Sequence, residues 1–324
     1  MSRPELSVVI VAEPEGFVER TIHALRVQTA ANRIEAIVVA AQTPGANLSS
    51  DPGAGLAAGR LLRVATCVSS VAAAAMGVRA AAAPVVALLE DHAFPEPNWA
   101  ESLLHAHTAG WDVVGSAISN GNPEDGTVSW AVLLIGYGDW VAPVTAREVD
   151  DLPQHNVSYK RALLTSRDGG LEELLARESR LHDDLRSSGC RFFLTDAEVR
   201  HVNPSRLGPA LRLRFHAGRL YGARRAERGR WTPARRFCYV AGSPLIPAVR
   251  LVRLRRRCLR TREWQALWPR ILPASLACFL ADALGQAAGY AVGSGDSPAR
   301  LARLETRRAR AVSLRERVVL GDVR

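Results

Sequence analysis

Three short apolar runs separated by helix-like stretches constrain the fold of this chain more than any other feature. The runs lie at residues 5–12, 34–41 and 85–89, and each has the aliphatic, β-branched character of a buried strand. Residues 17–29 carry apolar side chains at roughly helical spacing, and the alanine-rich stretch 71–83 leads into the third run. Strands that alternate with helices predict an α/β fold with a mostly parallel, Rossmann-like sheet.

The charge of the chain changes sign near residue 205. Residues 1–205 hold 16 basic and 25 acidic residues, a balance of −9, whereas residues 206–324 hold 26 and 7, a balance of +19. We therefore predict two domains, an α/β domain over 1–205 and an arginine-rich helical region over 206–324. The basic region is expected to bind anions, such as nucleic acid, anionic lipid headgroups or an acidic partner.

The composition also narrows the class of protein and its compartment. With 48% hydrophobic and 23% charged residues, the chain is neither disordered nor collagen-like. Its five cysteines show no CxxC spacing, which indicates reduced thiols in a cytosolic compartment rather than a disulfide framework or a zinc site. No apolar segment with a cleavage site follows the N-terminus, so no secretory signal is expected.

A cluster of metal-capable side chains follows the third apolar run. Glu90, Asp91 and His92 end the strand, and a Pro-x-Pro element then stops it. In open α/β sheets, ligands bind beyond the carboxyl ends of the strands. Carboxylates suit Mg²⁺ or Mn²⁺, and an imidazole shifts the preference towards Mn²⁺. The segment therefore predicts a divalent metal site, although strands also end in polar residues that bind no metal.

The run Val86–Trp99 resembles the acidic metal motif of family 2 glycosyltransferases of the GT-A fold. Five other segments resemble motifs of that family in the same order: Ser7–Pro14, Glu35–Val39, Gly77–Ala81, His155–Arg161 and Glu178–Gly189. The resemblance covers residues 5–205. It implies a GT-A-like domain that moves a sugar from a nucleotide-sugar donor to an acceptor hydroxyl, inverts the anomeric carbon and uses Mn²⁺ or Mg²⁺.

The resemblance also implies roles for individual residues. Glu178 would be the catalytic base, unless it belongs with its acidic neighbours to a solvated helix face. The metal would be held by Glu90, Asp91, His92 and His201, although His201 could equally close a strand. The donor would lie against Val11, Ala12, Glu13, Gln42 and Asp91. The acceptor would contact Trp99, His155 and Asn156, although a tryptophan is as often part of a core as a sugar-binding platform.

Three segments depart from the pattern of that family on the nucleotide side. Ala40-Ala41-Gln42 stands in place of a pair of aspartates, and Ala74-Ala75-Met76 in place of an element with an arginine. Glu13-Pro14 occupies a turn where Tyr-Asn is common. These departures leave an alternative function open, a catalytically degenerate module that binds a glycan, a nucleotide or a partner at the membrane.

Residues 271–292 form an apolar stretch long enough to cross about 30 Å of bilayer as a helix. Asp282 and Gln286 oppose a simple span, and they share one helix face with Ser275, Cys278 and Gly289. We expect an interfacial or re-entrant helix at the cytoplasmic face of the cell membrane, with arginines on anionic headgroups. The alternative is a helix buried against the catalytic domain.

Membrane association would suit a lipid-linked or cell-envelope glycan as acceptor. No nucleic acid is expected as a partner. The arginines alternate with aliphatic rather than aromatic residues, and the sequence has no helix-turn-helix or zinc module.

Overall fold

The structure is a computed structural model that describes residues 3–13, 15–42, 51–65, 69–153, 155–166, 170–176 and 178–321, without the side chains of 176 and 178–180. The chain divides into two compact units. The sheet unit comprises Met1–Gly121, Asp139–Val202 and Val318–Arg324, and the helical unit comprises Asn122–Gly138 and Asn203–Arg317. The chain thus passes between the units close to the expected boundary at residue 205. In addition, the helical unit takes in Asn122–Gly138 from the first part of the chain.

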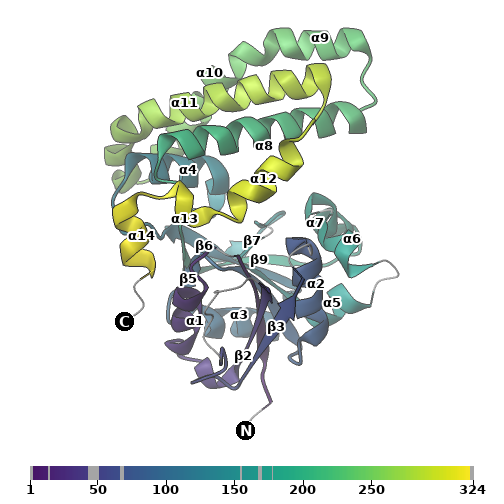
Figure 1. Cartoon of the computed structure of the whole chain (residues 1–324), viewed down its shortest axis with the longest axis vertical. Helices are drawn as coiled ribbons and strands as arrows, with labels where there is room; N and C mark the ends of the chain where they lie inside the picture. The colour runs from purple at the N-terminus through teal and green to yellow at the C-terminus, as the bar shows by residue number, and fades with distance from the viewer. Residues whose placement is uncertain are drawn as a thin grey trace. The chain divides into compact units, whose positions relative to one another are not determined.

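The sheet unit is built on a mixed, mostly parallel sheet (Figure 1). Strands β1 (Leu6–Ala12), β2 (Ile34–Ala41), β3 (Ala58–Val64) and β4 (Val85–Glu90) are parallel to one another. The remaining strands are β5 (Ala93–Pro95), β6 (Val113–Asn120), β7 (Arg147–Glu148), β8 (Val157–Lys160) and β9 (Phe192–His201). The strand order is β3-β2-β1-β4-β8-β6-β9-β5, with β7 paired to β9. Strand β8 runs antiparallel to β4 and β6, whereas β6 and β9 are parallel. The predicted α/β fold is confirmed.

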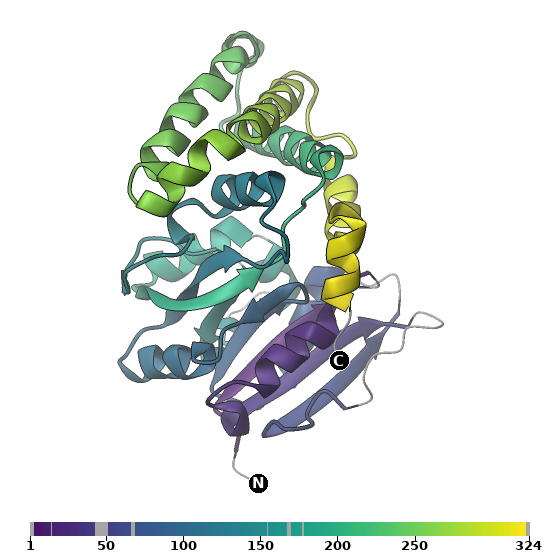
Figure 2. The same cartoon turned by 90° about the vertical axis from the view of Figure 1, so that its left-hand side faces the viewer.

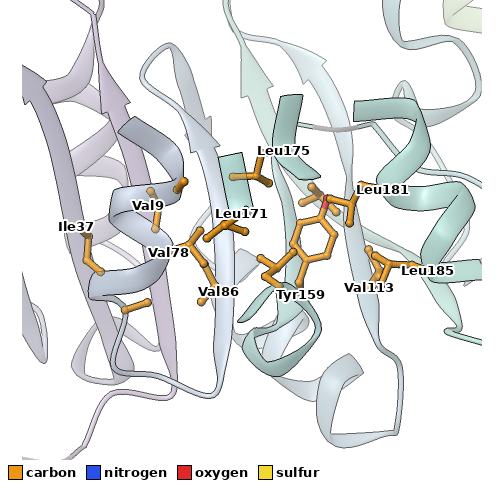
Figure 3. Packing of buried hydrophobic residues seen from close by; sticks show 14 of the residues in the cluster. Val9, Ile37, Val78, Val86, Val113, Tyr159, Leu171, Leu175, Leu181 and Leu185 are labelled. Atoms are coloured by element: carbon orange, nitrogen blue, oxygen red, sulfur yellow. The ribbon is translucent and has the colours of Figure 1, made fainter. Parts of the chain in front are cut away.

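Helices cover both faces of this sheet. One face packs against α2 (Ser70–Ala80), α5 (Arg161–Thr165), α6 (Leu171–Ala176) and α7 (Glu178–Ser187), and Figure 3 shows the apolar core between them. The core joins Val9 and Val86 of the strands to Leu175 and Leu185 of the helices. The opposite face carries α1 (Val18–Arg26), which lies in front of the strands in Figure 2, and α3 (Trp99–Thr108). Short 3₁₀ turns lie at Ala31–Arg33 and Gly138–Trp140.

The helical unit confirms the expected helical character of the basic region. Its helices are α4 (Thr127–Tyr137), α8 (Leu207–Arg228), α9 (Pro233–Gly242), α10 (Ile246–Cys258), α11 (Arg262–Val292), α12 (Ser297–Glu305) and α13 (Arg308–Ala311), with a 3₁₀ turn at Ser243–Leu245. Helix α14 (Leu314–Gly321) follows and leads back to the sheet unit. Helices α8 and α11 lie side by side, as Figure 2 shows nearly end-on.

A buried histidine makes the stability of the sheet unit sensitive to acid. His107 of α3 contacts the carbonyl of Trp111 through Nδ1 (3.1 Å) and the hydroxyl of Ser158 through Nε2 (2.9 Å). Burial lowers its pKa from 6.5 to about 4, and the hydrogen bond to Trp111 offsets this only in part. The folded state therefore holds His107 neutral at a pH where the unfolded chain binds a proton.

We predict that neutral His107 contributes fully to the free energy of unfolding above pH 6.5, and that this contribution is lost as the pH falls towards 4. The loss amounts to about 3 kcal/mol, since one unit of pKa corresponds to about 1.4 kcal/mol. Urea unfolding followed by circular dichroism at several pH values measures it. The His107→Gln variant keeps a donor for Trp111 but cannot titrate, so its stability should vary less over this range. An equal pH dependence in the two proteins would contradict the prediction.

Candidate metal centre at the strand ends

Three potential metal ligands meet beyond the carboxyl end of β4. Glu90 ends that strand, His92 lies two residues later, and His201 ends β9. One ligand atom from each lies within 4.8 Å of the others. Oε2 of Glu90 is 3.2 Å from Nε2 of His201, and Oε1 is 3.6 Å from Nε2 of His92. Both histidines are buried and their rings meet edge to face at a centroid distance of 4.8 Å. These residues could hold a divalent metal.

Asp91 was expected among the metal ligands, but the cluster of three potential ligands does not include it. Its buried carboxylate accepts a hydrogen bond from the backbone N–H of Glu13 through Oδ2 (2.9 Å). The other oxygen, Oδ1, lies 2.9 Å from Nδ1 of His92. An ionised carboxylate requires a proton on Nδ1, which leaves the lone pair of Nε2 for a metal. Asp91 thus positions a ligand and ties the end of β4 to the turn after β1.

Asn156 was expected to contact an acceptor, but the structure places its buried side chain on Glu90. Its amide donates to Oε2 of Glu90 (3.0 Å), and its carbonyl oxygen accepts from the backbone N–H of Glu90 (3.2 Å). The backbone of Asn156 is left-handed, with φ of 58°, a conformation that asparagine adopts more readily than most residues. Asn156 therefore fixes the orientation of Glu90, and the expected acceptor contact is corrected.

The surroundings of Glu90 keep its carboxylate ionised. Burial raises the pKa of Glu90, but the nearby histidines 155, 92 and 201 and the hydrogen bond from His201 outweigh this effect. The pKa of Glu90 consequently lies well below its usual range. His155 is exposed, so its role towards an acceptor stays a prediction. An ionised carboxylate beside two imidazoles is the chemistry that a divalent cation requires.

Trp99 does not offer a platform for a sugar. Its side chain is fully buried at the start of α3, and its indole N–H donates to the hydroxyl of Ser116 at 2.8 Å. The tryptophan is core packing between α3 and β6, so the expected contact with an acceptor is corrected. The segment Pro95-Glu-Pro-Asn-Trp99 thus attaches α3 to the sheet.

The residues expected to bind a donor lie at the carboxyl ends of the two neighbouring strands. Val11 and Ala12 end β1, Glu13 follows them, and Gln42 follows β2 with an exposed side chain. Because β1 pairs with both β2 and β4, these ends and Glu90 lie along one edge of the sheet. Their contact with a nucleotide stays a prediction.

The helix that begins at Glu178 is anchored by a chain of polar groups around the buried His182. Nε2 of His182 lies 2.9 Å from the hydroxyl of Tyr159 on β8, and Nδ1 lies 3.1 Å from Oδ1 of Asp151. Burial raises the pKa of Asp151, but the hydrogen bonds from His182 and Leu152 outweigh it, so the pKa is lower than usual. The side chain of Glu178 lies outside the described residues, and its role as a base stays a prediction.

Gly16 supports the metal centre although no sequence motif singles it out. A Cβ atom at this position would lie 1.7 Å from Oδ2 of Asp91, so any other residue would displace that carboxylate. The backbone N–H of Phe17 also donates to the carbonyl of Asp91 (3.2 Å). A glycine shortly after the first strand is the signal that could have revealed this close approach.

Comparison with known proteins gives distant structural similarities. No protein-family model matches the chain, and no curated protein matches it. Residues 1–349 of S. aureus TarS in complex with UDP give a TM-score of 0.48 at 14% identity, covering 84% of this chain and 89% of that one. Glucosyl-3-phosphoglycerate synthase from Mycobacterium tuberculosis in complex with phosphoglyceric acid gives 0.39 at 17% identity, covering 62% and 72%. At this level of similarity, the function has to be argued from the residues of the metal centre.

Proposed function

We propose that the chain is a metal-dependent, inverting glycosyltransferase that uses a nucleotide-sugar donor. The observation that carries the proposal is the convergence of Glu90, His92 and His201 at the carboxyl end of β4. This edge of an α/β sheet is where such folds bind their ligands. The acceptor that we propose is a hydroxyl of a lipid-linked or cell-envelope glycan.

The ligand atoms of Glu90, His92 and His201 suit a divalent cation. Metal–ligand bonds of about 2.0–2.2 Å place ligand atoms within about 4.4 Å of one another. The separations here reach 4.8 Å, so the side chains need to move by only a few tenths of an ångström. Two imidazoles favour Mn²⁺ over Mg²⁺. A bound cation would neutralise the charge that develops on a leaving diphosphate.

The remaining work falls to the side chains around the metal centre. Asp91 holds the tautomer of His92, and Asn156 holds the carboxylate of Glu90. We propose that Glu178 accepts the proton of the acceptor hydroxyl as that oxygen attacks the anomeric carbon. Transfer with one base and no nucleophile from the enzyme inverts the anomeric carbon. The hydrogen bonds of His182 in α7 restrict the helix that carries this base.

A degenerate binding module is the second candidate, and one observation favours it. Where the resembled family has two aspartates, this chain has Ala40, which is buried, and Ala41. These side chains provide no polar contact for a nucleotide. In this alternative, the metal centre would bind a nucleotide or glycan without transfer.

The Glu178→Gln variant separates the two candidates. We predict that it keeps metal-dependent thermal stabilisation by the preferred nucleotide sugar, while turnover falls about 1000-fold, as expected for loss of a general base. Thermal shift and donor hydrolysis across a panel of nucleotide sugars with Mn²⁺ provide both measurements. The control is Asp184→Asn, which changes an exposed carboxylate on the same helix.

The outcomes differ clearly between the candidates. Stabilisation by one nucleotide sugar without turnover in the wild type would favour the binding module. Unchanged turnover in Glu178→Gln would remove this residue from the mechanism. No stabilisation by any donor with Mn²⁺ would reject both candidates.

A further inference from the structure

Helix α11 buries a polar stripe together with apolar residues such as Ile271 and Phe279, and it leaves other large apolar residues exposed. Ser275, Cys278, Asp282 and Gln286 are all buried within the helical unit. Nη1 of Arg250 lies 2.5 Å from Oδ2 of Asp282, which also accepts from the amide of Gln286 (2.9 Å). The polar groups of Asp282 and Gln286 are thus hydrogen-bonded inside the unit.

The outward face of α11 is apolar over its last six turns. Its exposed large side chains are Leu272, Leu276, Leu280, Leu284 and Val292. The leucines are four residues apart and therefore form one continuous row. Between residues 272 and 292, no exposed position carries a charge or a polar side chain. At 1.5 Å per residue, the row of leucines from 272 to 284 extends over about 18 Å.

A second apolar face lies on the segment from α9 to α10. Its exposed large residues are Phe237, Leu245, Val249 and Val252, and no exposed residue between 237 and 252 is charged. By length and composition, residues Pro233–Cys258 and Arg262–Val292 are the two described segments that could cross a membrane. Only 17% of the most apolar window of the first is buried.

Two contacts tie these faces into one body. Arg236 at the start of α9 donates to the carbonyl of Tyr290 near the end of α11 (3.2 Å), and Arg250 of α10 pairs with Asp282. The α9–α10 segment therefore runs back along α11, and Figure 1 shows these helices side by side.

Arginines border the apolar face on α9–α10. Arg235 precedes the face on α9–α10, and three exposed arginines, Arg253, Arg255 and Arg256, follow it directly. Exposed apolar surface of this extent indicates a partner, and the flanking charge indicates an anionic one. A second copy of the chain would bring like charges together, and a nucleic acid would leave the leucine row exposed to water. An anionic bilayer satisfies both features, because acyl chains accept the leucines and phosphates accept the arginines.

We propose that the helical unit binds the surface of an anionic membrane through the outward faces of α11 and α9–α10. The leucine row lies at the boundary between headgroups and acyl chains, and Arg253, Arg255 and Arg256 contact lipid phosphates. The seven arginines of residues 233–258 and the buried Asp282 of α11 suit a position in the interface rather than a span. This inference rests on the surface of the helical unit and is independent of glycosyl transfer.

Vesicle flotation of the full chain tests the proposal. We expect the wild type to float with vesicles of equal phosphatidylglycerol and phosphatidylcholine, and much less with phosphatidylcholine alone. The Leu280→Glu/Leu284→Glu variant should lose at least about tenfold in vesicle partitioning, since charges enter the apolar face. Its control, Val27→Glu/Val318→Glu, introduces the same charges on the sheet unit and should float as the wild type does.

The exposed fractions of the two pairs match. They are 48% and 65% for Leu280 and Leu284, and 50% and 63% for Val27 and Val318.

A third variant, Arg253→Gln/Arg255→Gln/Arg256→Gln, should weaken binding to the anionic vesicles about 100-fold, because each arginine near the surface contributes about 1 kcal/mol. Circular dichroism and gel filtration confirm that each variant is folded.

Four results would overturn the proposal. Equal flotation of the Leu280/Leu284 variant and its control would show that another surface binds lipid. A dimer that the same glutamates dissociate, without flotation of the wild type, would identify a second copy as the partner. Salt-sensitive binding to DNA without flotation would identify a nucleic acid. Resistance of the bound chain to carbonate extraction would indicate that it spans the bilayer.

Discussion

Replacing Glu90 by glutamine should abolish metal binding while the chain stays folded. Glu90 supplies the single carboxylate of the three-residue cluster, and a neutral amide oxygen is a much weaker ligand for a divalent cation. We expect the affinity for Mn²⁺ to fall by at least about 100-fold, and metal-dependent sugar transfer by about 1000-fold. Isothermal titration with Mn²⁺ measures the first effect without requiring a substrate.

The glutamine can keep the hydrogen bond from Asn156, so the fold should survive the change. Removal of the charge removes its desolvation cost but also its attraction to the neighbouring histidines, so a thermal melt has to accompany the titration. The matched control is Glu96→Gln, since Glu96 pairs with Arg200 at 2.7 Å and lies outside the cluster. Wild-type affinity for Mn²⁺ in Glu90→Gln would show that no metal binds here.

Asp91→Asn provides a graded comparison. If Asp91 only positions His92, its loss should cost about 10–100-fold in metal affinity, as is typical of residues that orient a ligand. A loss as large as that of Glu90→Gln would instead show that Asp91 is itself a ligand and would restore the role expected from the sequence.

The location of the metal centre could be predicted from the sequence because it depends on topology. An apolar strand that ends in Glu90 and His92 places these side chains at the carboxyl edge of a parallel sheet whatever the detailed packing is. His201 is 109 positions after His92, but it also ends a strand, and β9 lies in the same sheet. Two strands, β8 and β6, separate β4 from β9 in the sheet, and the pairing of Ala93 in β5 with His201 brings the two histidines together. The family resemblance, rather than periodicity, predicted the role of His201.

The roles of individual side chains could not be predicted because they depend on rotamers. Glu90 and Asp91 are adjacent carboxylates, yet Glu90 joins the cluster whereas Asp91 contacts Glu13 and His92. Trp99 has the spacing of a sugar platform, but the direction of α3 points it into the core. A sequence pattern fixes which residues are near a site and leaves open which atoms face it.

The polar stripe of α11 shows the same limit at a larger scale. Its helical spacing was readable from Ser275 to Gly289, and the structure confirms that these residues share a face. Which face points inward depends on what packs against it. Here α8 provides a matching surface of small residues, so the polar stripe is buried and the leucines are left outside.

Replacing Gly285 by alanine should separate α8 from α11. A Cβ atom at Gly285 would lie 2.1 Å from the carbonyl oxygen of Phe215, and one at Gly289 would lie 2.2 Å from that of Arg219. On the other helix, a Cβ atom at Gly218 would lie 2.4 Å from the carbonyl oxygen of Asp282, and one at Gly222 would lie 2.6 Å from that of Gln286. Backbone atoms cannot rotate away as side chains do, so the helices themselves must move.

We expect Gly285→Ala to lower the free energy of unfolding of the helical unit by about 2–4 kcal/mol, because two close-packed backbones are forced apart. The separation would also expose Asp282 and Gln286, whose hydrogen bonds lie in the same interface. Gly208→Ala is the control, since a Cβ atom there meets nothing within 4 Å. Alanine has the higher helix propensity, so the control should be unchanged or stabilised by up to about 1 kcal/mol. Thermal melts by circular dichroism compare the two, and equal stability would mean that α8 and α11 are not held together by their glycines.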